Sequence, residues 1–195
     1  MSYDYENIIN STHLVPFSKN YKIGNFKCKY DEYNDFLVDQ AEDFENGNVS
    51  STQLLIDNLT GDVIGYFSLC MASIKLTDSE KNDCNMDNVP FNSIPVLKIG
   101  KLAIDEGYSS KQKGYGSYLI QLVRGMAYEI NEISKVACRF IVVDADIEHD
   151  KNTPCFYEKN GFVLNESVKG NRRTVSMRLD IFKGLSKEIE KEVIA

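Results

Sequence analysis

The spacing of apolar residues predicts two amphipathic helices. Near the beginning of the chain, Tyr30, Tyr33, Leu37, Ala41 and Phe44 recur every three or four residues, which places them on one face of a helix that ends at Asn46-Gly47. A longer helix is predicted after residue 117, where one face carries Leu119, Leu122, Val123, Met126, Ala127 and Ile130.

Shorter apolar runs predict β-strands between and after these helices. STQLLID (51–57) and VIGYFSLCMASI (63–74) flank the turn-forming residues 58–62, so they predict an antiparallel hairpin, with Gly65 marking a bulge. Further strands are predicted from VLKIGKLAID (96–105), FIVVDA (140–145) and RRTVSMRLD (172–180). The stretch TPCFYEKNGF (153–162) predicts a short helix closed by Asn160-Gly161.

The connection from Lys75 to Pro95 is polar and long for a compact domain. It fits a binding loop or lid, and it fits a mobile surface insertion equally well.

Composition narrows the class of protein. The chain has 195 residues, of which 43% are hydrophobic and 26% charged, as expected for one globular α/β or α+β domain over 1–195. A net charge of −7 disfavours polyanion partners. Five scattered cysteines without a C-x-x-C pair favour a reducing cytoplasm and predict no metal site. No apolar run suits a signal peptide or a membrane span.

The stretch SSKQKGYGSYLI (109–120) places two glycines between a predicted strand and a predicted helix. Such a turn exposes backbone N–H groups at the positive end of the helix dipole, where a phosphate binds readily. The spacing matches neither the P-loop nor the dinucleotide fingerprint. Taken alone, the two glycines are also what a tight turn opening a helix would require.

Together with CFYEKNGF (155–162), this stretch resembles the GNAT superfamily of N-acetyltransferases. The residues that match its signature are Lys111, Gly114, Gly116, Phe156, Tyr157, Gly161 and Phe162. The resemblance spans about residues 26–180, leaving 181–195 as a C-terminal tail, and it implies a mixed, largely antiparallel sheet of six to seven strands flanked by helices.

The resemblance implies acetyl-CoA as the acetyl donor. Its pyrophosphate would bind the turn formed by Lys111, Gln112, Lys113, Gly114, Tyr115, Gly116 and Ser117, and its pantetheine would pair along Leu102, Ala103 and Ile104. Two residues depart from the pattern. Lys111 replaces the usual Arg or Gln but keeps a donor, whereas Asp150 stands where an Asn often begins the later helix, so no cofactor contact is assigned to it.

Acetyl transfer to an amine requires a proton for the departing thiolate, and the resemblance assigns Tyr157 as that general acid. The general base stays open. Asp105, Glu106, Asp144 and Asp146 lie near the ends of predicted strands but fit surface carboxylates better, His149 fits a solvated loop residue, and a water relay would also serve. Cys155 has no His partner in sequence and fits a small buried residue.

The leading hypothesis is a cytoplasmic N-acetyltransferase that acts on a primary amine of a small molecule or a protein. Its oligomeric state, homodimer or otherwise, is left open. The second hypothesis is a GNAT-type toxin that acetylates aminoacyl-tRNA and is neutralised by a DNA-binding antitoxin; the acidic net charge argues against tRNA, and the order of elements argues for it. The third is a non-catalytic acyl-CoA-binding module. The basic residues Lys169, Arg172, Arg173 and Arg178 are interpreted as an exposed hairpin rather than an RNA-binding patch.

Overall fold

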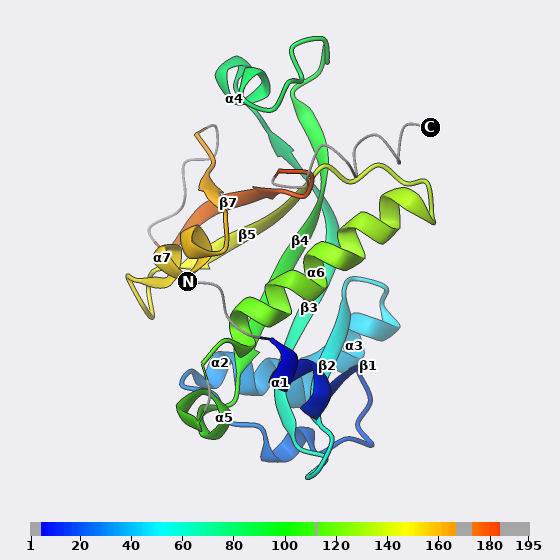
Figure 1. The fold of residues 1–195 in the computed structure, drawn as a ribbon, viewed down its shortest axis with the longest axis vertical. Coiled ribbons are helices and arrows are strands. Elements are labelled where there is room, and N and C mark those ends of the chain that lie inside the picture. The colour runs from blue at the N-terminus through cyan, green and yellow to red at the C-terminus, as the bar shows by residue number, and fades with distance from the viewer. Residues whose placement is uncertain (1–4, 112, 167–172, 184–195) are drawn as a thin grey trace.

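The computed structural model describes residues 5–111, 113–166 and 173–183 (Figure 1). Its strands form one seven-stranded sheet in the order β1-β2-β3-β4-β5-β7-β6. They are β1 Thr12–Pro16, β2 Ser51–Asp57, β3 Val63–Lys75, β4 Ser93–Ile104, β5 Phe140–Asp146, β6 Val163–Leu164 and β7 Thr174–Asp180. Within the described residues β4 and β5 are the one parallel pair. The predicted mixed, largely antiparallel sheet is confirmed.

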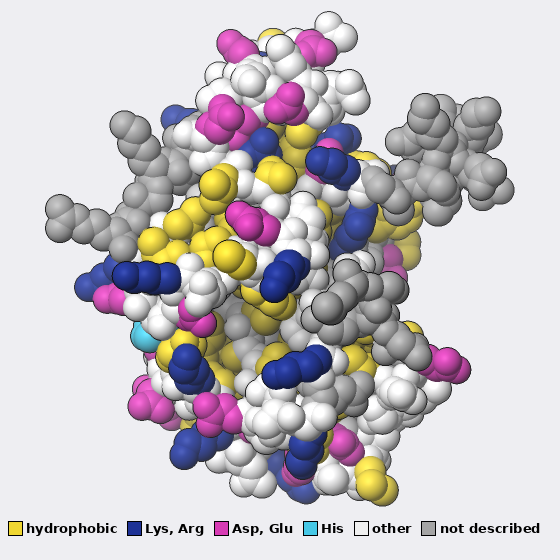
Figure 2. Space-filling view, turned by 60° about the vertical axis from the view of Figure 1, so that its left-hand side comes forward, with side chains coloured by type: hydrophobic (Ala, Val, Ile, Leu, Met, Phe, Trp, Pro, Cys, Tyr) yellow, Lys and Arg dark blue, Asp and Glu magenta, His cyan; other side chains and the backbone are white. Residues whose placement is uncertain are grey.

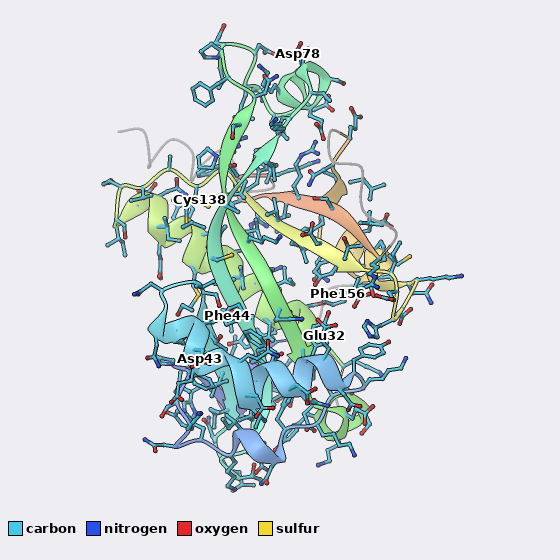
Figure 3. All side chains as sticks on the ribbon, turned by 180° about the vertical axis from the view of Figure 1, so that it is seen from behind. Glu32, Asp43, Phe44, Asp78, Cys138 and Phe156 are labelled. Carbon is cyan, nitrogen blue, oxygen red and sulfur yellow. The ribbon has the colours of Figure 1, made fainter. Side chains whose placement is uncertain are left out.

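Helices cover both faces of this sheet. They are α1 Glu6–Ser11, α2 Asp31–Asp35, α3 Ala41–Asn46, α4 Asp78–Asn82, α5 Glu106–Lys111, α6 Tyr115–Glu132 and α7 Thr153–Lys159, with a 3₁₀ turn at Ile23–Asn25 and a π turn at Phe36–Gln40. On one face, the predicted apolar stripe of α6 buries Leu119, Val123 and Ala127 against strand residues such as Phe67 and Ile141. On the other face, α2 and α3 lie across the strands, as Figure 3 shows from behind.

The first predicted helix is confirmed, but a π turn divides it into α2 and α3. A π turn holds one residue more than an α turn, so the apolar face changes phase along the helix. Leu37 and Ala41 are fully buried as predicted, whereas Phe44 is exposed and Phe36 takes an inward position that the spacing did not predict.

The predicted bulge at Gly65 is confirmed and holds β3 close to β4. The β2–β3 register shifts at Leu55/Ile56, directly opposite this glycine. A Cβ atom at Gly65 would lie 2.8 Å from the carbonyl oxygen of Ala103 and would also overlap Ile104. Glycine therefore permits the close approach of the β4 segment that later forms one wall of the candidate site.

The segment predicted as a long loop is an ordered extension of the β3–β4 hairpin. It contains α4, whose N-terminus has a capping box between Thr77 and Glu80. Glu80 is buried and ion-paired with Arg178 of β7. Arg178 was expected in an exposed basic hairpin; that expectation is wrong, because the α4 extension folds back over this part of β7 and covers its guanidinium.

Candidate active site

The parallel strands β4 and β5 pair along only part of their length. Val96–Ile99 of β4 pair with Phe140–Val143 of β5, and the ladder stops there. Beyond that point β4 continues to Ile104 with β3, and β5 continues to Asp146 with β7. The backbone edge of β4 from Gly100 to Ile104 that faces β5 therefore has no strand partner among the described residues. Figure 1 shows the two strands diverging towards α2 and α7.

A cleft of about 230 Å³ opens where the strands diverge. Leu102, Ala103 and Ile104, predicted to pair with pantetheine, line one wall. The end of β5 and the start of α7 form the opposite wall, and residues at the beginning of α2 close a third side. Figure 2 shows this face of the molecule, where Lys and Arg side chains interspersed with Asp and Glu surround a hollow.

The predicted glycine turn lies at the N-terminus of α6. Gly114 precedes the helix with φ of 112°, in the left-handed region that favours glycine, and no side chain caps this end. The first N–H groups of a helix have no partner within it, so those at the start of α6 are available to a ligand. The structure inserts α5 between β4 and the turn, which the sequence did not predict.

The individual turn residues differ in environment. Lys111 and Lys113 are exposed, Ser117 is buried, and Tyr115 is buried with its ring edge-on to Tyr108. Tyr115 can thus offer a ligand only its backbone. Gln112 lies outside the described residues.

Gly116 allows α6 to pack closely against α7. A Cβ atom on Gly116 would lie 3.2 Å from the ring of Phe156. Phe156 and Thr153 line the cleft and also a second hollow of about 1090 Å³, which Ser117 and Gln121 border on the α6 side. The cleft and the second hollow thus lie next to each other along α7, and the second hollow reaches the first turn of α6 at Ser117.

Tyr157 lines the cleft from α7, as predicted for the general acid. The residue is 6% exposed, and its ring packs edge-on against Phe156 and Phe162 at centroid distances of 5.0 and 5.2 Å. Burial raises the pKa of its phenol well above the ordinary value of 10.0. Within the described part of the chain, its hydroxyl has no hydrogen-bond partner.

The structure separates the four candidate carboxylates. Asp105 accepts hydrogen bonds from the backbone N–H groups of Lys27 and Gly107 at 2.9 and 2.8 Å, a structural role at the start of α5. Glu106 is exposed beside it. Asp144 and Asp146 both line the cleft, and Asp144 is ion-paired with Lys98 at 2.7 Å. Asp146 therefore remains as a cleft carboxylate without a lysine or arginine partner among the described ion pairs.

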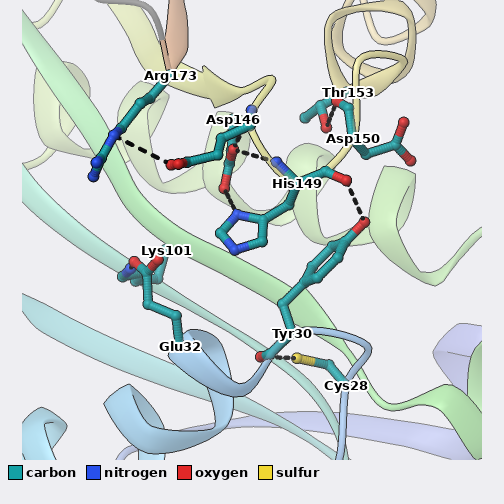
Figure 4. Close-up of polar contacts among 10 residues, drawn as sticks. Cys28, Tyr30, Glu32, Lys101, Asp146, His149, Asp150, Thr153 and Arg173 are labelled. Carbon is teal, nitrogen blue, oxygen red and sulfur yellow. Dashed lines mark hydrogen bonds and ion pairs between the residues drawn. The ribbon is translucent and has the colours of Figure 1, made fainter.

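Asp146 is hydrogen-bonded to His149, and both line the cleft. Figure 4 shows His149 between Tyr30 and the Lys101–Glu32 ion pair. Its side chain is 34% exposed, so the expectation of a solvated loop residue is confirmed, although its hydrogen bond to Asp146 was not predicted. The loop after β5 turns back over the strand end because Asp146 also accepts the N–H of Glu148 and of His149, at 2.9 and 3.1 Å.

Tyr30, Tyr33 and Lys101 line the cleft, and the sequence reasoning did not assign them to it. The Lys101 ammonium lies 4.8 Å from the centroid of the Tyr33 ring. Burial is the main reason why the pKa of Tyr33 is raised to about 12. A lysine between Gly100 and Leu102 of a predicted strand was the available signal for Lys101, but nothing in the local pattern places it opposite α2.

The structure also bears on the sequence interpretations of the basic residues and of Cys155. Arg173 is exposed and ion-paired with Glu148 at 3.4 Å, while Lys169 and Arg172 lie outside the described residues. Cys155, expected to be buried, is exposed at the second hollow.

Among residues 5–111, 113–166 and 173–183, no group of three or more His, Cys, Asp or Glu side chains could hold a metal ion. None of the described helices has the length and hydrophobicity to span a membrane.

No protein-family model matches the sequence, and no curated protein matches it. Solved structures do resemble the fold. AtaT complexed with acetyl-methionyl-tRNAfMet superposes with a TM-score of 0.71 and 19% identity, covering 93% of this chain and 98% of that chain. A tyrosine-to-phenylalanine mutant of KacT gives 0.70 and 20%, covering 93% and 99%. AtaTR bound with AcCoA gives 0.67 and 20%, covering 94% and 98%. The predicted resemblance to the GNAT superfamily is confirmed as a likeness of fold.

Proposed function

We propose that this protein is an acetyl-CoA-dependent N-acetyltransferase that transfers an acetyl group to a primary amine by direct attack. The observation that carries the proposal is the free edge of β4 at Leu102–Ile104, which lies in one cleft with Tyr157 and next to a second hollow that reaches the first turn of α6. AtaTR, which shares the fold, has been solved with AcCoA bound.

The residues present suit the proposed donor. Within Leu102–Ile104, the N–H and C=O groups that face away from β3, those of every second residue, would pair with the amides of pantetheine, as in the addition of a strand to a sheet edge. The pyrophosphate would bind the N–H groups at the start of α6, where Lys111 and Lys113 add positive charge. Gln112 is the remaining residue of the proposed pyrophosphate-binding turn.

The chemistry follows from the same placement. The amine nitrogen attacks the thioester carbonyl, and the departing sulfur requires a proton. Tyr157 is protonated at neutral pH, buried beside the free edge of β4, and has an unpartnered hydroxyl among the described residues, so it is the proposed donor of that proton.

The acceptor can be a small molecule or a protein, and one observation favours a second class. AtaT was solved with acetyl-methionyl-tRNAfMet, and a tyrosine-to-phenylalanine mutant of AtaT was solved bound to the C-terminus of the antitoxin AtaR. By analogy of fold, the acceptor of this protein would be the amino group of an aminoacyl-tRNA, and an antitoxin would be its partner. The exposed Lys29, which lines the cleft, offers a phosphate contact within a chain of net charge −7.

We expect the purified protein to bind coenzyme A with unchanged affinity in the presence of a chelator, since backbone N–H groups hold the pyrophosphate. Gly116→Asp places a carboxylate at the α6 N-terminus and should weaken the affinity by about tenfold or more. Gly125→Asp is the matched control on the same helix, since a Cβ atom there has open space around it. Calorimetry measures both. Equal affinities in folded variants would contradict the proposed pyrophosphate site.

The acceptor class is tested by following acetyl-CoA consumption with spermidine, amino acids, peptides and methionyl-tRNA. We expect turnover with one of these classes of acceptor. Acetylation of methionyl-tRNA together with growth arrest on expression would establish the toxin function, whereas turnover with spermidine or a peptide alone would exclude it. Binding of coenzyme A without turnover of any acceptor would favour the non-catalytic module.

A further inference from the structure

Asp146 and His149 form a hydrogen-bonded pair at the end of β5. Nδ1 of His149 lies 2.6 Å from Oδ2 of Asp146. A carboxylate at Nδ1 selects the neutral tautomer that carries its proton there, which leaves Nε2 as a base. No hydrogen bond to Nε2 occurs among the described residues. The pair thus combines an orienting carboxylate with a free imidazole nitrogen.

The orientation of the imidazole ring is restricted by its neighbours. Its centroid lies 4.8 Å from that of Tyr30, whose hydroxyl donates to the backbone carbonyl oxygen of His149 at 3.3 Å. His149 and Tyr157 line the same cleft, from the loop after β5 and from α7 respectively. In Figure 4 the second ring nitrogen lies on the side of the ring away from Asp146.

We propose that His149 is the general base of the acetyl transfer and that Asp146 is its positioning residue. The proposal rests on the proposed function, which leaves the base unassigned. Two other candidates are less suited to this role: Asp144 is held by Lys98, and Asp105 is engaged with backbone N–H groups outside the cleft.

The proton and electron balance is complete with these two groups. The lone pair of the neutral amine forms the N–C bond, and the C–S bond breaks with its electron pair on sulfur. The nitrogen loses one proton to Nε2 of His149, and the thiolate takes one from Tyr157. Water then carries the proton from His149 back to Tyr157, so the net products are the N-acetylated acceptor and free coenzyme A.

The charges around His149 determine the pH range in which it acts. The hydrogen bond to Asp146 is the main reason why the pKa of His149 is raised above 6.5. The other ionisable groups that face it are Tyr30 just before α2, Glu32 from α2, Lys101 from β4, and Glu148 with Arg173 from the β5 and β7 ends. Since a base must be unprotonated, turnover should rise with pH through a midpoint above 6.5.

His149→Asn is the most direct test. The asparagine amide can keep the hydrogen bond to Asp146 near the position of Nδ1, but it cannot accept a proton in place of Nε2. We expect kcat to fall by about 100-fold, with coenzyme A affinity unchanged, and added imidazole to restore part of the rate for His149→Ala. His13→Asn is the matched control, because His13 lies on β1 outside the cleft. Methionyl-tRNA and spermidine serve as acceptors.

The pH profile distinguishes a base from a purely structural histidine. Asp146→Asn removes the charge that raises the pKa of His149, so the midpoint should move to lower pH, whereas the ionisation of the acceptor amine stays the same in every variant. A profile that is unchanged in both variants, or parental kcat in His149→Asn, overturns the proposal while leaving the acetyltransferase function intact. Absence of turnover in the wild type with every acceptor overturns both.

Discussion

Tyr157→Phe should lower turnover by about tenfold to a thousandfold while the affinity for coenzyme A stays nearly unchanged. The substitution removes one hydroxyl and keeps the ring that packs against Phe156 and Phe162. Because that hydroxyl has no partner among the described residues, its removal leaves no described polar group without a hydrogen bond. The loss should therefore appear in the rate and only slightly in the melting temperature.

The control for this experiment is Tyr128→Phe on α6. The ring of Tyr128 packs against Phe182 and lines neither the cleft nor the second hollow. Turnover and melting temperature are measured for both variants. A general acid must be protonated, and burial raises the pKa of Tyr157 above 10.0, so the wild-type rate should fall only at pH above that value. If Tyr157→Phe turns over at the parental rate, the proton comes from water or from another side chain.

Arg178→Met should destabilise the fold by about 3–5 kcal/mol, the largest stability effect that we expect of any single substitution. Arg178 is 5% exposed and Glu80 is 1% exposed. The guanidinium donates to Glu80, to the Leu164 carbonyl oxygen and to Asn165 Oδ1, the last two at 2.9 Å. Methionine keeps much of the volume but leaves the Glu80 carboxylate buried without its cation.

Urea unfolding measures this effect. The double variant Glu80→Gln/Arg178→Met should recover part of the loss, since no buried charge remains. The control is Glu42→Gln, which breaks the exposed pair with Lys19 and should cost under about 1 kcal/mol. A cost equally small for Arg178→Met would show that the β3–β4 extension is held by its apolar contacts instead.

The Glu80–Arg178 ion pair should also make the free energy of unfolding depend on pH. Burial acts to raise the pKa of Glu80, but hydrogen bonds from the backbone N–H groups of Thr77 and Glu166 and the charge of Arg178 outweigh it, so the pKa lies below 4.5. The stabilisation is therefore fully present above pH 4.5 and is lost as the pH falls through the lowered value. Glu80→Gln should be less stable at neutral pH and should lose less stability on acidification, as urea unfolding at several pH values would show.

Local sequence patterns determined most of the elements of the fold. The apolar repeat of α6, the strand runs of β2 and β3 and the turn after α7 each depend on residues close together in the chain, so their periodicity was readable without the structure. The π turn was not readable, because the change of phase that buries Phe36 and exposes Phe44 is stabilised by packing against the sheet.

The candidate site divides in the same way. Gly114, Gly116 and Tyr157 were proposed as site residues from short motifs that resemble the GNAT signature, and the structure places them at a left-handed turn, at a close contact between α6 and α7, and in the cleft. Which acidic residues line the cleft, and that His149 is paired with Asp146, depended on where β4 and β5 stop pairing and on how the next loop folds back. Likewise, Arg178 and Glu80 are 98 residues apart and meet only in the folded chain. The sequence by itself thus determined the local elements and the motif residues within them. Tertiary structure decided the charge pairings, because these depend on contacts between distant segments.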